Sequence, residues 1–314
     1  MTAAAAPGLA AGARGLVTAC HPLPTVFVTG FVTAYGATVG LRSGTLALLA
    51  LAVLLGQLSI GWCNDAVDAV RDTTAGRRDK PVAAGLVGRR AVAVAAALAL
   101  VVCLAASFAL GPRAGTVHAV VVAAGWVYDL GLKGTVLSGV PYVVAFGSLP
   151  AVATLAYADD LFGGLPFFGR SFGWFAAGEQ AERIAELLGT PRPLGWPPYA
   201  VMAGTALLGL AAHFANTVGD TEADAATGVR GLPQRVGPRR SLTVTAVLVA
   251  AAAVVLAVGA ADPSPVALAV LGVGALSATG GVLVAGVTAQ RGRLAFRLTL
   301  AAVGLVVTGF LLAV

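Results

Sequence analysis

Residues 64–85 read NDAVDAVRDTTAGRRDKPVAAG, and residues 216–237 read NTVGDTEADAATGVRGLPQRVG, so one pattern of polar residues occurs twice at the same spacing. The sequence around both copies is almost entirely apolar. Ionisable side chains in or beside a membrane are costly and usually mark a functional site. The two copies therefore predict one polar site built from two halves of the chain. The matched residues are Asn64, Asp68, Asp72, Gly76, Arg78, Pro81 and Gly85 in the first copy and Asn216, Asp220, Asp224, Gly228, Arg230, Pro233 and Gly237 in the second.

Composition places the chain outside the class of soluble globular proteins. The mean hydropathy is +0.89 and only 11% of residues are charged, whereas soluble domains carry about 25% charged residues. Repeated apolar runs of about 20 residues predict a single polytopic membrane domain over residues 1–314. The net charge of +6 does not indicate nucleic acid, because the few aromatic residues are not interleaved with the basic ones. We expect membrane lipid as a partner and no nucleic acid.

The predicted fold class is an all-α polytopic membrane protein with about nine transmembrane helices. Lys and Arg concentrate on the N-terminal tail and on the loops that follow residues 63, 131, 215 and 287, where the second, fourth, sixth and eighth predicted helices end. The positive-inside rule then puts the N-terminus and both copies of the repeat at the cytoplasmic face of the plasma membrane. Because both copies face the same side, the repeat is parallel rather than inverted. The predicted ranges are 24–41, 44–63, 91–111, 115–131, 136–158, 197–215, 241–260, 264–287 and 294–313.

Residues 159–196 interrupt the apolar pattern with acidic residues, Gly and Pro. We interpret them as an external loop insertion with a short amphipathic helix around residues 179–188. Such a segment is either a tolerated surface insertion or a lid or partner-binding element.

The carboxylates of each copy fall on one helix face. At 100° per residue, the acidic residues of the first copy lie within an arc of about 100° and those of the second within about 80°. Two such faces opposite each other repel unless a cation lies between them. Hard oxygen ligands favour Mg²⁺, which is typically held by one or two carboxylates together with substrate phosphates. Nearby basic residues suit a diphosphate bridged by Mg²⁺, and the candidates are Arg71, Arg78, Lys80, Lys133 and Arg230.

Other polar residues near the copies leave two interpretations open. His213 lies on the same helical face as Asp220, so it either lines the site or is a packed, hydrogen-bonded histidine. The matched glycines and prolines either shape the site or simply end helices and form turns.

These motifs resemble the signature of the UbiA superfamily of intramembrane prenyltransferases. The resemblance covers the whole predicted core. It departs from the family pattern at Asp129, where an uncharged residue is more usual, and in the length of the 159–196 insertion. No dedicated acceptor-binding motif is present. The motifs that carry it are Asn64-Asp65-x-x-Asp68-x-x-x-Asp72, Asp220-x-x-x-Asp224, Tyr128-x-x-x-Leu132-Lys133, Arg78-Asp79-Lys80-Pro81 and Leu232-Pro233.

The resemblance implies an all-helical bundle around a central cavity that opens toward the cytoplasm and laterally toward lipid. The aspartate motifs would bind Mg²⁺ and an isoprenyl diphosphate donor, while Lys133 would contact the diphosphate and Tyr128 the reacting centre. An unknown lipophilic acceptor would capture the allylic cation. The implied catalytic residues are Asp68, Asp72, Asp220, Asp224, Tyr128 and Lys133. The implied substrate-binding residues are Asn64, Asp65, Arg71, Arg78, Lys80, Asn216, Arg230 and His213, and the implied metal ligands are Asn64, Asp68, Asp72, Asp220 and Asp224.

Two other functions remain open at this point. A terpene cyclase of the same superfamily would use the same diphosphate site, with a double bond of the donor capturing the cation. A cation- or proton-coupled transporter would need polar residues near mid-membrane on several helices, and the sequence holds few.

Overall fold

The computed structural model describes residues 9–162, 195–218, 228–285 and 292–313. Regular structure in these ranges is helical throughout, with no strand among the described residues, as the predicted all-α class requires. One long helix lies in each predicted apolar range. These helices are α2 (Pro22–Val39), α3 (Ser43–Thr74), α4 (Arg89–Ala109), α5 (Pro112–Asp129), α6 (Val140–Phe162), α9 (Tyr199–Val218), α12 (Pro238–Gly259), α13 (Pro265–Ala285) and α14 (Gly292–Leu311).

Six of these helices, α2, α3, α4, α6, α9 and α12, are long and apolar enough to cross a membrane by length and composition. The apolar segments of α13 and α14, Pro265–Gly280 and Leu300–Leu311, are shorter. The chain is therefore an integral membrane protein.

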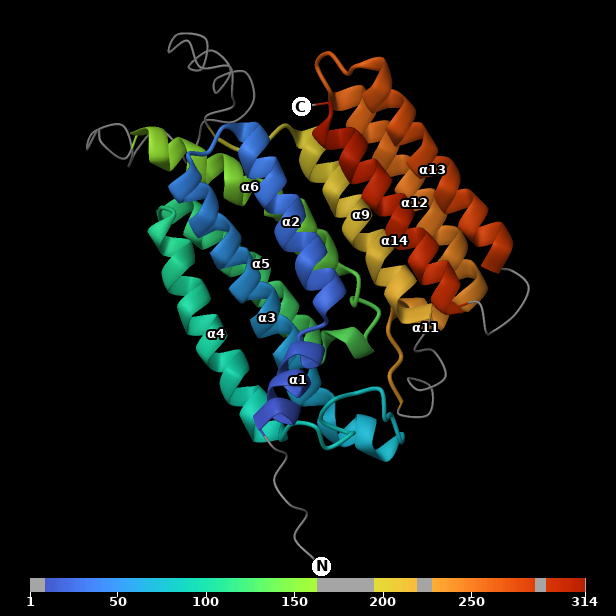
Figure 1. The fold of residues 1–314 in the computed structure, drawn as a ribbon. Helices are drawn as coiled ribbons and strands as arrows, with labels where there is room; N and C mark the ends of the chain where they lie inside the picture. The colour runs from blue at the N-terminus through green and yellow to red at the C-terminus, as the bar shows by residue number, and fades with distance from the viewer. Residues whose placement is uncertain (1–8, 163–194, 219–227, 286–291, 314) are drawn as a thin grey trace, which may run out of the picture.

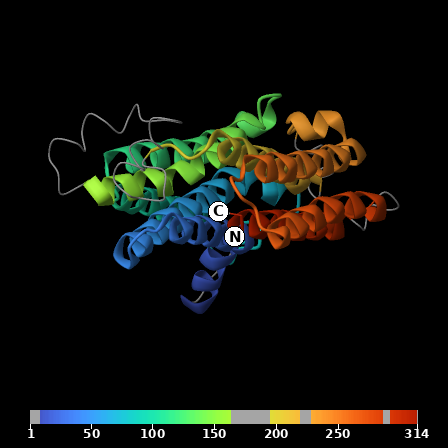
Figure 2. The same cartoon turned by 90° about the horizontal axis from the view of Figure 1, so that it is seen from above.

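The long helices form a closed ring (Figure 1). Each contacts the next in chain order from α2 to α14, and α14 contacts α2 again. Seen from above, the amino-terminal helices occupy one half of the bundle and α12–α14 the other (Figure 2). Leu49 and Val53 of α3 belong to the same hydrophobic core as Leu149 and Val152 of α6, and all four are at most 2% exposed. The frequent Ala and Gly residues allow such close helix packing in lipid.

A short helix that the sequence analysis did not predict precedes the ring. Helix α1 (Leu9–Ala19) lies across the end of α3 (Figure 1). The indole Nε1 of Trp62 donates a hydrogen bond of 2.9 Å to the carbonyl of Leu16. Ala19 and Val87 are buried in the same small apolar cluster. These contacts hold the chain against α3 immediately before α2 begins.

Gly61 permits the closest approach between this N-terminal segment and α3. A Cβ atom at position 61 would lie 2.6 Å from the carbonyl oxygen of Cys20. The glycine therefore fixes how near the joint between α1 and α2 can come to α3, and this joint carries His21.

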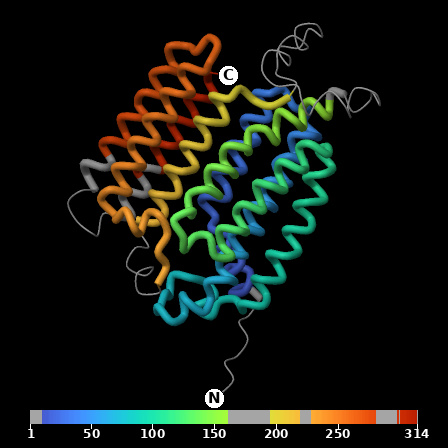
Figure 3. Tube along the Cα trace, turned by 180° about the vertical axis from the view of Figure 1, so that it is seen from behind, coloured from blue at the N-terminus to red at the C-terminus, as the bar shows by residue number. Residues whose placement is uncertain are grey.

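The two copies of the repeat lie at the same end of the bundle, which we call the repeat end (Figure 3). Helices α3 and α9 both run toward it. The matched glycines described by the structure all have a positive φ, +67° at Gly76 and +75° at Gly228, and +74° at Gly85 and +87° at Gly237. Residues that carry a side chain rarely adopt a positive φ. The repeat is thus parallel, as predicted, and its glycines are needed for backbone geometry.

The predicted loop insertion begins later than expected. Helix α6 continues to Phe162, so Asp159 and Asp160 belong to its last turns. Both pair with arginines at the end opposite the repeat: Arg113 Nε donates to Asp159 Oδ1 at 2.8 Å, and Arg42 Nε donates to Asp160 Oδ2 at 2.8 Å. The short amphipathic helix predicted around residues 179–188 lies outside the described residues.

Candidate active site

A polar cavity of about 310 Å³ lies at the repeat end. The end of α3, the connection between α5 and α6, the end of α9 and the joint between α1 and α2 supply its walls. Its lining mixes carboxylates, amides and cationic side chains, including Asn64, Asp65, Asp68, Arg71, Lys80 and Lys133. The structure therefore brings together residues that the two motifs and the Tyr128–Lys133 motif place far apart in sequence.

Lys133 provides the shortest link across this cavity. It lies in a short 3₁₀ turn, η1 (Leu132–Gly134). Its Nζ donates to both oxygens of Asp68 at 2.6 Å and to Oδ1 of Asn64 at 3.1 Å. Arg71 Nη2 donates to Asp68 Oδ2 at 2.7 Å. Asp68, only 6% exposed, is therefore held between two cations.

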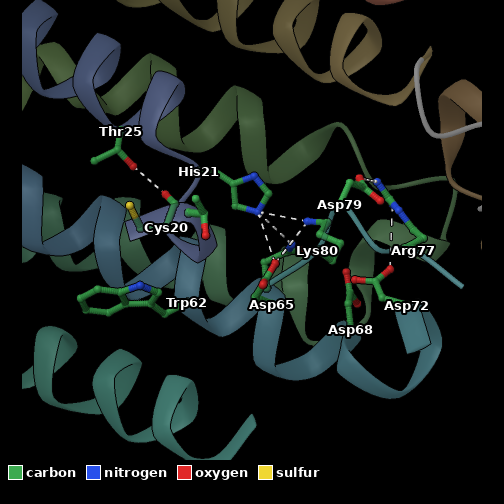
Figure 4. A network of polar contacts seen from close by, with 12 residues as sticks. Cys20, His21, Thr25, Trp62, Asp65, Asp68, Asp72, Arg77, Asp79 and Lys80 are labelled. Carbon is green, nitrogen blue, oxygen red and sulfur yellow. Dashed lines mark hydrogen bonds and ion pairs between the residues drawn. The ribbon is translucent and has the colours of Figure 1, made fainter. Parts of the chain in front are cut away.

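Asp65 and His21 form the opposite side of the same network (Figure 4). Lys80 Nζ lies 3.2 Å from Asp65 Oδ1 and 3.4 Å from Nε2 of His21. His21 Nε2 also lies 3.4 Å from Nδ2 of Asn64. The pKa of His21 is lowered to about 3. Partial burial of the ring is the largest cause, and the positive charges of Lys80, Arg77 and Lys133 add to it. The imidazole is thus neutral near pH 7 and supplies a lone pair to its neighbours.

His21 has a strained backbone. It is the one residue other than glycine with a positive φ, 53°, among the residues that the structure describes. Non-glycine residues in this region cost free energy and persist where surrounding contacts fix them. The contact of Cys20 with Gly61 and the hydrogen bond of 2.8 Å from Thr25 Oγ1 to the Cys20 carbonyl provide that fixation.

Asp72 has a different setting from the other acidic residues of α3. It is 2% exposed and is not among the residues that line the polar cavity. Its Oδ1 lies 3.9 Å from Nη1 of Arg77, and its carbonyl accepts the backbone N–H of Arg77 at 2.9 Å. The carboxylate lies next to Arg77 (Figure 4).

Arg77, which the sequence analysis did not select, lines the cavity instead of Arg78. Arg77 Nη2 donates to Asp79 at 3.1 Å, and its side chain is 18% exposed. Arg78 is exposed at the surface. The chain turns at Gly76 directly after α3, and this turn decides which of two adjacent arginines faces inward. Arg230, the counterpart of Arg78, is also exposed, and its carbonyl accepts a hydrogen bond from Arg235.

The second copy of the repeat reaches the same cavity. Asn216 and Thr217 from α9, together with Val229 and Gln234, are part of its lining. Gln234 belongs to a short helix, α11 (Leu232–Val236), whose first N–H donates to Ser138 Oγ at 2.9 Å. Asp220 and Asp224 lie outside the described residues. The two halves therefore meet, as the repeat predicted, although the second pair of aspartates is not described.

The polar cavity continues into apolar space. A chamber of about 210 Å³, the apolar chamber, shares the wall residues His21, Asn64, Tyr128 and Asn216 with it. An inner chamber of about 120 Å³ shares Tyr142 and Phe146 with the apolar chamber. Phe27, Phe31 and Val307 of the inner chamber also line a groove between α2 and α14. A charged compartment thus leads, step by step, to the flank of the bundle.

His213 is a packed residue rather than a wall of these spaces. It is 1% exposed, and its Nε2 lies 3.0 Å from Oγ of Ser138. Its ring centroid lies 4.7 Å from that of Tyr142 and 5.7 Å from that of Tyr128. His213 therefore packs against the rings of both tyrosines. Its partner Ser138 also accepts the first N–H of α11, so His213 helps to hold the second copy of the repeat in place.

The donor set suits a hard divalent cation. Asn64, Asp65 and Asp68 present amide and carboxylate oxygens at one cavity, and Oδ2 of Asp65 is buried without a hydrogen-bond partner among the described residues. Oxygen ligands of this kind are those that Mg²⁺ prefers. Within the described ranges no group of three His, Cys, Asp or Glu side chains is close enough to hold a metal alone, so a bound cation needs further ligands.

Comparison with protein families identifies the chain. The model of the UbiA prenyltransferase family matches residues 23–301, which span α2 to α14. The chain belongs to the UbiA prenyltransferase family. No curated protein sequence matched it.

Solved structures share the fold of this chain. A UbiA homologue from Aeropyrum pernix K1, solved without ligand, is 18% identical with a TM-score of 0.68, and the match covers 91% of this chain and 96% of that one. A UbiA homologue from Archaeoglobus fulgidus bound to GPP and Mg²⁺ is 14% identical with a TM-score of 0.60, over 96% and 100% of the two chains. A structure of digeranylgeranylglyceryl phosphate synthase is 12% identical with a TM-score of 0.62, over 96% and 98%.

Proposed function

We propose that this chain is a Mg²⁺-dependent intramembrane prenyltransferase that moves an isoprenyl group from an isoprenyl diphosphate to a lipophilic acceptor. The observation that carries the proposal is that the polar cavity and the apolar chamber lie side by side and share His21, Asn64 and Tyr128 as wall residues. An isoprenyl diphosphate has the same division, with a charged head and an apolar tail. The homologue from Archaeoglobus fulgidus is bound to GPP and Mg²⁺, which supports the same substrate class here.

The head of the donor belongs in the polar cavity. Asn64 and Asp68 from α3, with Asp220 and Asp224 from the second copy, are the proposed ligands of Mg²⁺. Asp72 is not among the residues that line the cavity, so it would join these ligands only after Arg77 moves aside. When bound, the metal supplies positive charge that stabilises the leaving diphosphate. Lys133, Lys80 and Arg71 line the cavity and bind the remaining diphosphate oxygens. Their charges offset the negative charge that develops as the allylic carbon–oxygen bond breaks.

Four residues expected to bind the substrate keep a place in this proposal, with different roles. Asn216 lines both the polar cavity and the apolar chamber, so it contacts the donor where head meets tail. Arg78 and Arg230 are exposed and act, if the diphosphate draws them in, from the outer edge. His213 acts through Tyr128 and Tyr142 by fixing their rings.

The reacting carbon lies where polar and apolar spaces meet. Tyr128 is part of both walls, and its ring packs edge-on against Tyr142 at a centroid distance of 5.2 Å. Aromatic faces attract a cation, so this pair stabilises the allylic cation. The apolar chamber and the inner chamber hold the prenyl tail and keep water away from the cation.

Membrane topology completes the proposal. All nine long helices cross the bilayer, with the N-terminus and the repeat end at the cytoplasmic face of the plasma membrane. The asymmetry of Lys and Arg between the two ends supports this orientation. A water-soluble diphosphate product then leaves directly into the cytoplasm, while the groove between α2 and α14 admits lipophilic molecules from the bilayer.

The proposal is tested with purified protein, Mg²⁺ and geranylgeranyl diphosphate. We expect slow release of diphosphate that EDTA abolishes. Asp68→Ala and Asp220→Ala should abolish release while the variants still insert in the membrane. Asp262→Ala is the matched control, because Asp262 is exposed in the loop between α12 and α13. Full activity of either site variant contradicts the proposal, and a cyclised hydrocarbon as the product identifies a cyclase.

A further inference from the structure

Asp129 is a buried carboxyl group that the proposed diphosphate site does not use. It is the last residue of α5, directly after Tyr128, and is 3% exposed. Its Oδ2 has no hydrogen-bond partner among the residues that the structure describes. A buried polar atom left without a partner costs free energy, so its presence calls for an explanation.

The position of Asp129 relative to the two compartments supplies one. Asp129 lines the apolar chamber but not the polar cavity, whereas its neighbour Tyr128 lines both. The carboxyl group therefore lies on the apolar side of Tyr128, beside the point proposed for the reacting carbon.

The nearest cation along the chain is already engaged elsewhere. Lys133 Nζ donates to Asp68 and Asn64, and the structure gives no salt bridge between Lys133 and Asp129. Gly125 and Val121, one and two turns earlier on α5, face the same chamber, whose walls also include Gln57, Asn64 and Asn216. The Oδ2 atom nevertheless has no hydrogen-bond partner among the described residues. A hydrogen-bond donor from a ligand is the partner that this chamber leaves room for.

We propose that Asp129 is a catalytic residue that binds the hydroxyl group of a lipophilic alcohol or phenol acceptor and takes its proton during transfer. This inference rests on the proposed prenyltransferase function and specifies its acceptor class. The Oδ2 atom of Asp129 accepts the hydroxyl hydrogen bond and so orients the acceptor oxygen toward the reacting carbon beside Tyr128.

The allylic carbon–oxygen bond of the donor breaks, and its electron pair stays on the diphosphate. A lone pair of the acceptor oxygen forms the new carbon–oxygen bond, which makes an ether. The hydroxyl proton moves to the Asp129 carboxylate and passes to water when the products leave. A positioned carboxylate of this kind contributes about 10²- to 10⁴-fold to a proton-transfer step.

The test uses labelled geranylgeranyl diphosphate with Mg²⁺ and a lipid extract of the cells from which the chain comes, either untreated or acetylated to block hydroxyl groups. The measured quantity is the ratio of labelled lipid product to diphosphate released, which is independent of the amount of active protein. Asp129→Asn keeps the size of the side chain but cannot take the proton. Asp262→Asn is the control aspartate, and Asp129→Glu tests partial rescue by a carboxyl group.

We expect the ratio to fall at least about tenfold in Asp129→Asn, to recover in part in Asp129→Glu, and to fall to background with the acetylated extract. A wild-type ratio in Asp129→Asn, or unchanged product from the acetylated extract, overturns the inference. So does wild-type protein that releases diphosphate but labels nothing in the untreated extract. Wild-type protein that releases no diphosphate contradicts the prenyltransferase proposal itself, which is a separate failure.

Discussion

The ammonium nitrogen of Lys133 lies 2.6 Å from both carboxylate oxygens of Asp68. This contact joins the connection between α5 and α6 to the end of α3, across 65 residues of sequence. Charge-assisted hydrogen bonds of this length are strong. In the proposed site Asp68 would hold Mg²⁺ and Lys133 would bind the diphosphate, so each of these two groups now occupies the place of the other's proposed partner.

Lys133→Met should slow diphosphate release by about 10²- to 10³-fold, the usual loss when one charge-stabilising donor is removed from an active site. The fold should survive, because Asp68 keeps its 2.7 Å hydrogen bond from Arg71. Diphosphate release and the melting temperature in detergent measure the two effects. Lys133→Arg, which retains the charge, should lose less activity. Equal activity of Lys133→Met and wild type would remove Lys133 from the site.

Arg77 and Arg78 form a natural matched pair. Arg77 lines the cavity and stands near Asp72 and Asp79, whereas Arg78 is exposed. We expect Arg77→Met to raise the KM for geranylgeranyl diphosphate by about tenfold, equivalent to about 1.4 kcal/mol, and Arg78→Met to raise it less. Steady-state kinetics of both variants checks the order. The reverse order would mean that substrate binding rearranges the turn after α3.

Gly61→Ala should destabilise the protein by about 1–3 kcal/mol, the usual cost of an overpacked contact. The added methyl would lie 2.6 Å from the Cys20 carbonyl and push the His21 joint away from α3. Gly30→Ala is the control, since Gly30 is also helical and has nothing within 4 Å of the added atom. Thermal unfolding in detergent compares the two. A Gly61→Ala protein as stable as Gly30→Ala would show that this joint is free to move.

Replacing a glycine of the repeat by alanine should destabilise the protein by a similar amount in both copies. Gly76→Ala and Gly228→Ala each place a side chain at positive φ, which costs about 1–2 kcal/mol. Gly88→Ala is the control, because Gly88 has a φ of −74° and open space around it. Chemical or thermal unfolding of the three variants measures the difference. If all three behave alike, the turns adopt another backbone conformation in the membrane.

The sequence predicted the architecture well because its signals are local. Apolar runs of transmembrane length and the charged segments between them located all nine long helices. The matched spacing of the two copies predicted that they act together, and the structure puts both at one end of the bundle with glycines of matching φ. Helix α1 was not predicted, because its apolar face is short and its stability depends on contacts with Trp62 and Val87.

The detailed composition of the site could not be predicted from helical spacing. Asp72 shares a helix face with Asp68, yet a turn after α3 sets Arg77 against it and keeps it out of the cavity wall. His213 shares a face with Asp220, yet the hydrogen bond with Ser138 and the packing of Tyr142 make it a core residue. His21 and Asp129 enter the walls only because distant helices meet beside them.

The amino-acid sequence by itself determined the membrane environment, the positions of the long helices and the pairing of two acidic motifs, because hydropathy and residue spacing act within short stretches of chain. The tertiary structure alone decided which cations face which carboxylates and which polar groups border the apolar chamber. Those choices depend on turns such as the one at Gly76 and on close contacts such as that of Gly61 with Cys20, because such contacts form only when segments distant in sequence pack against one another.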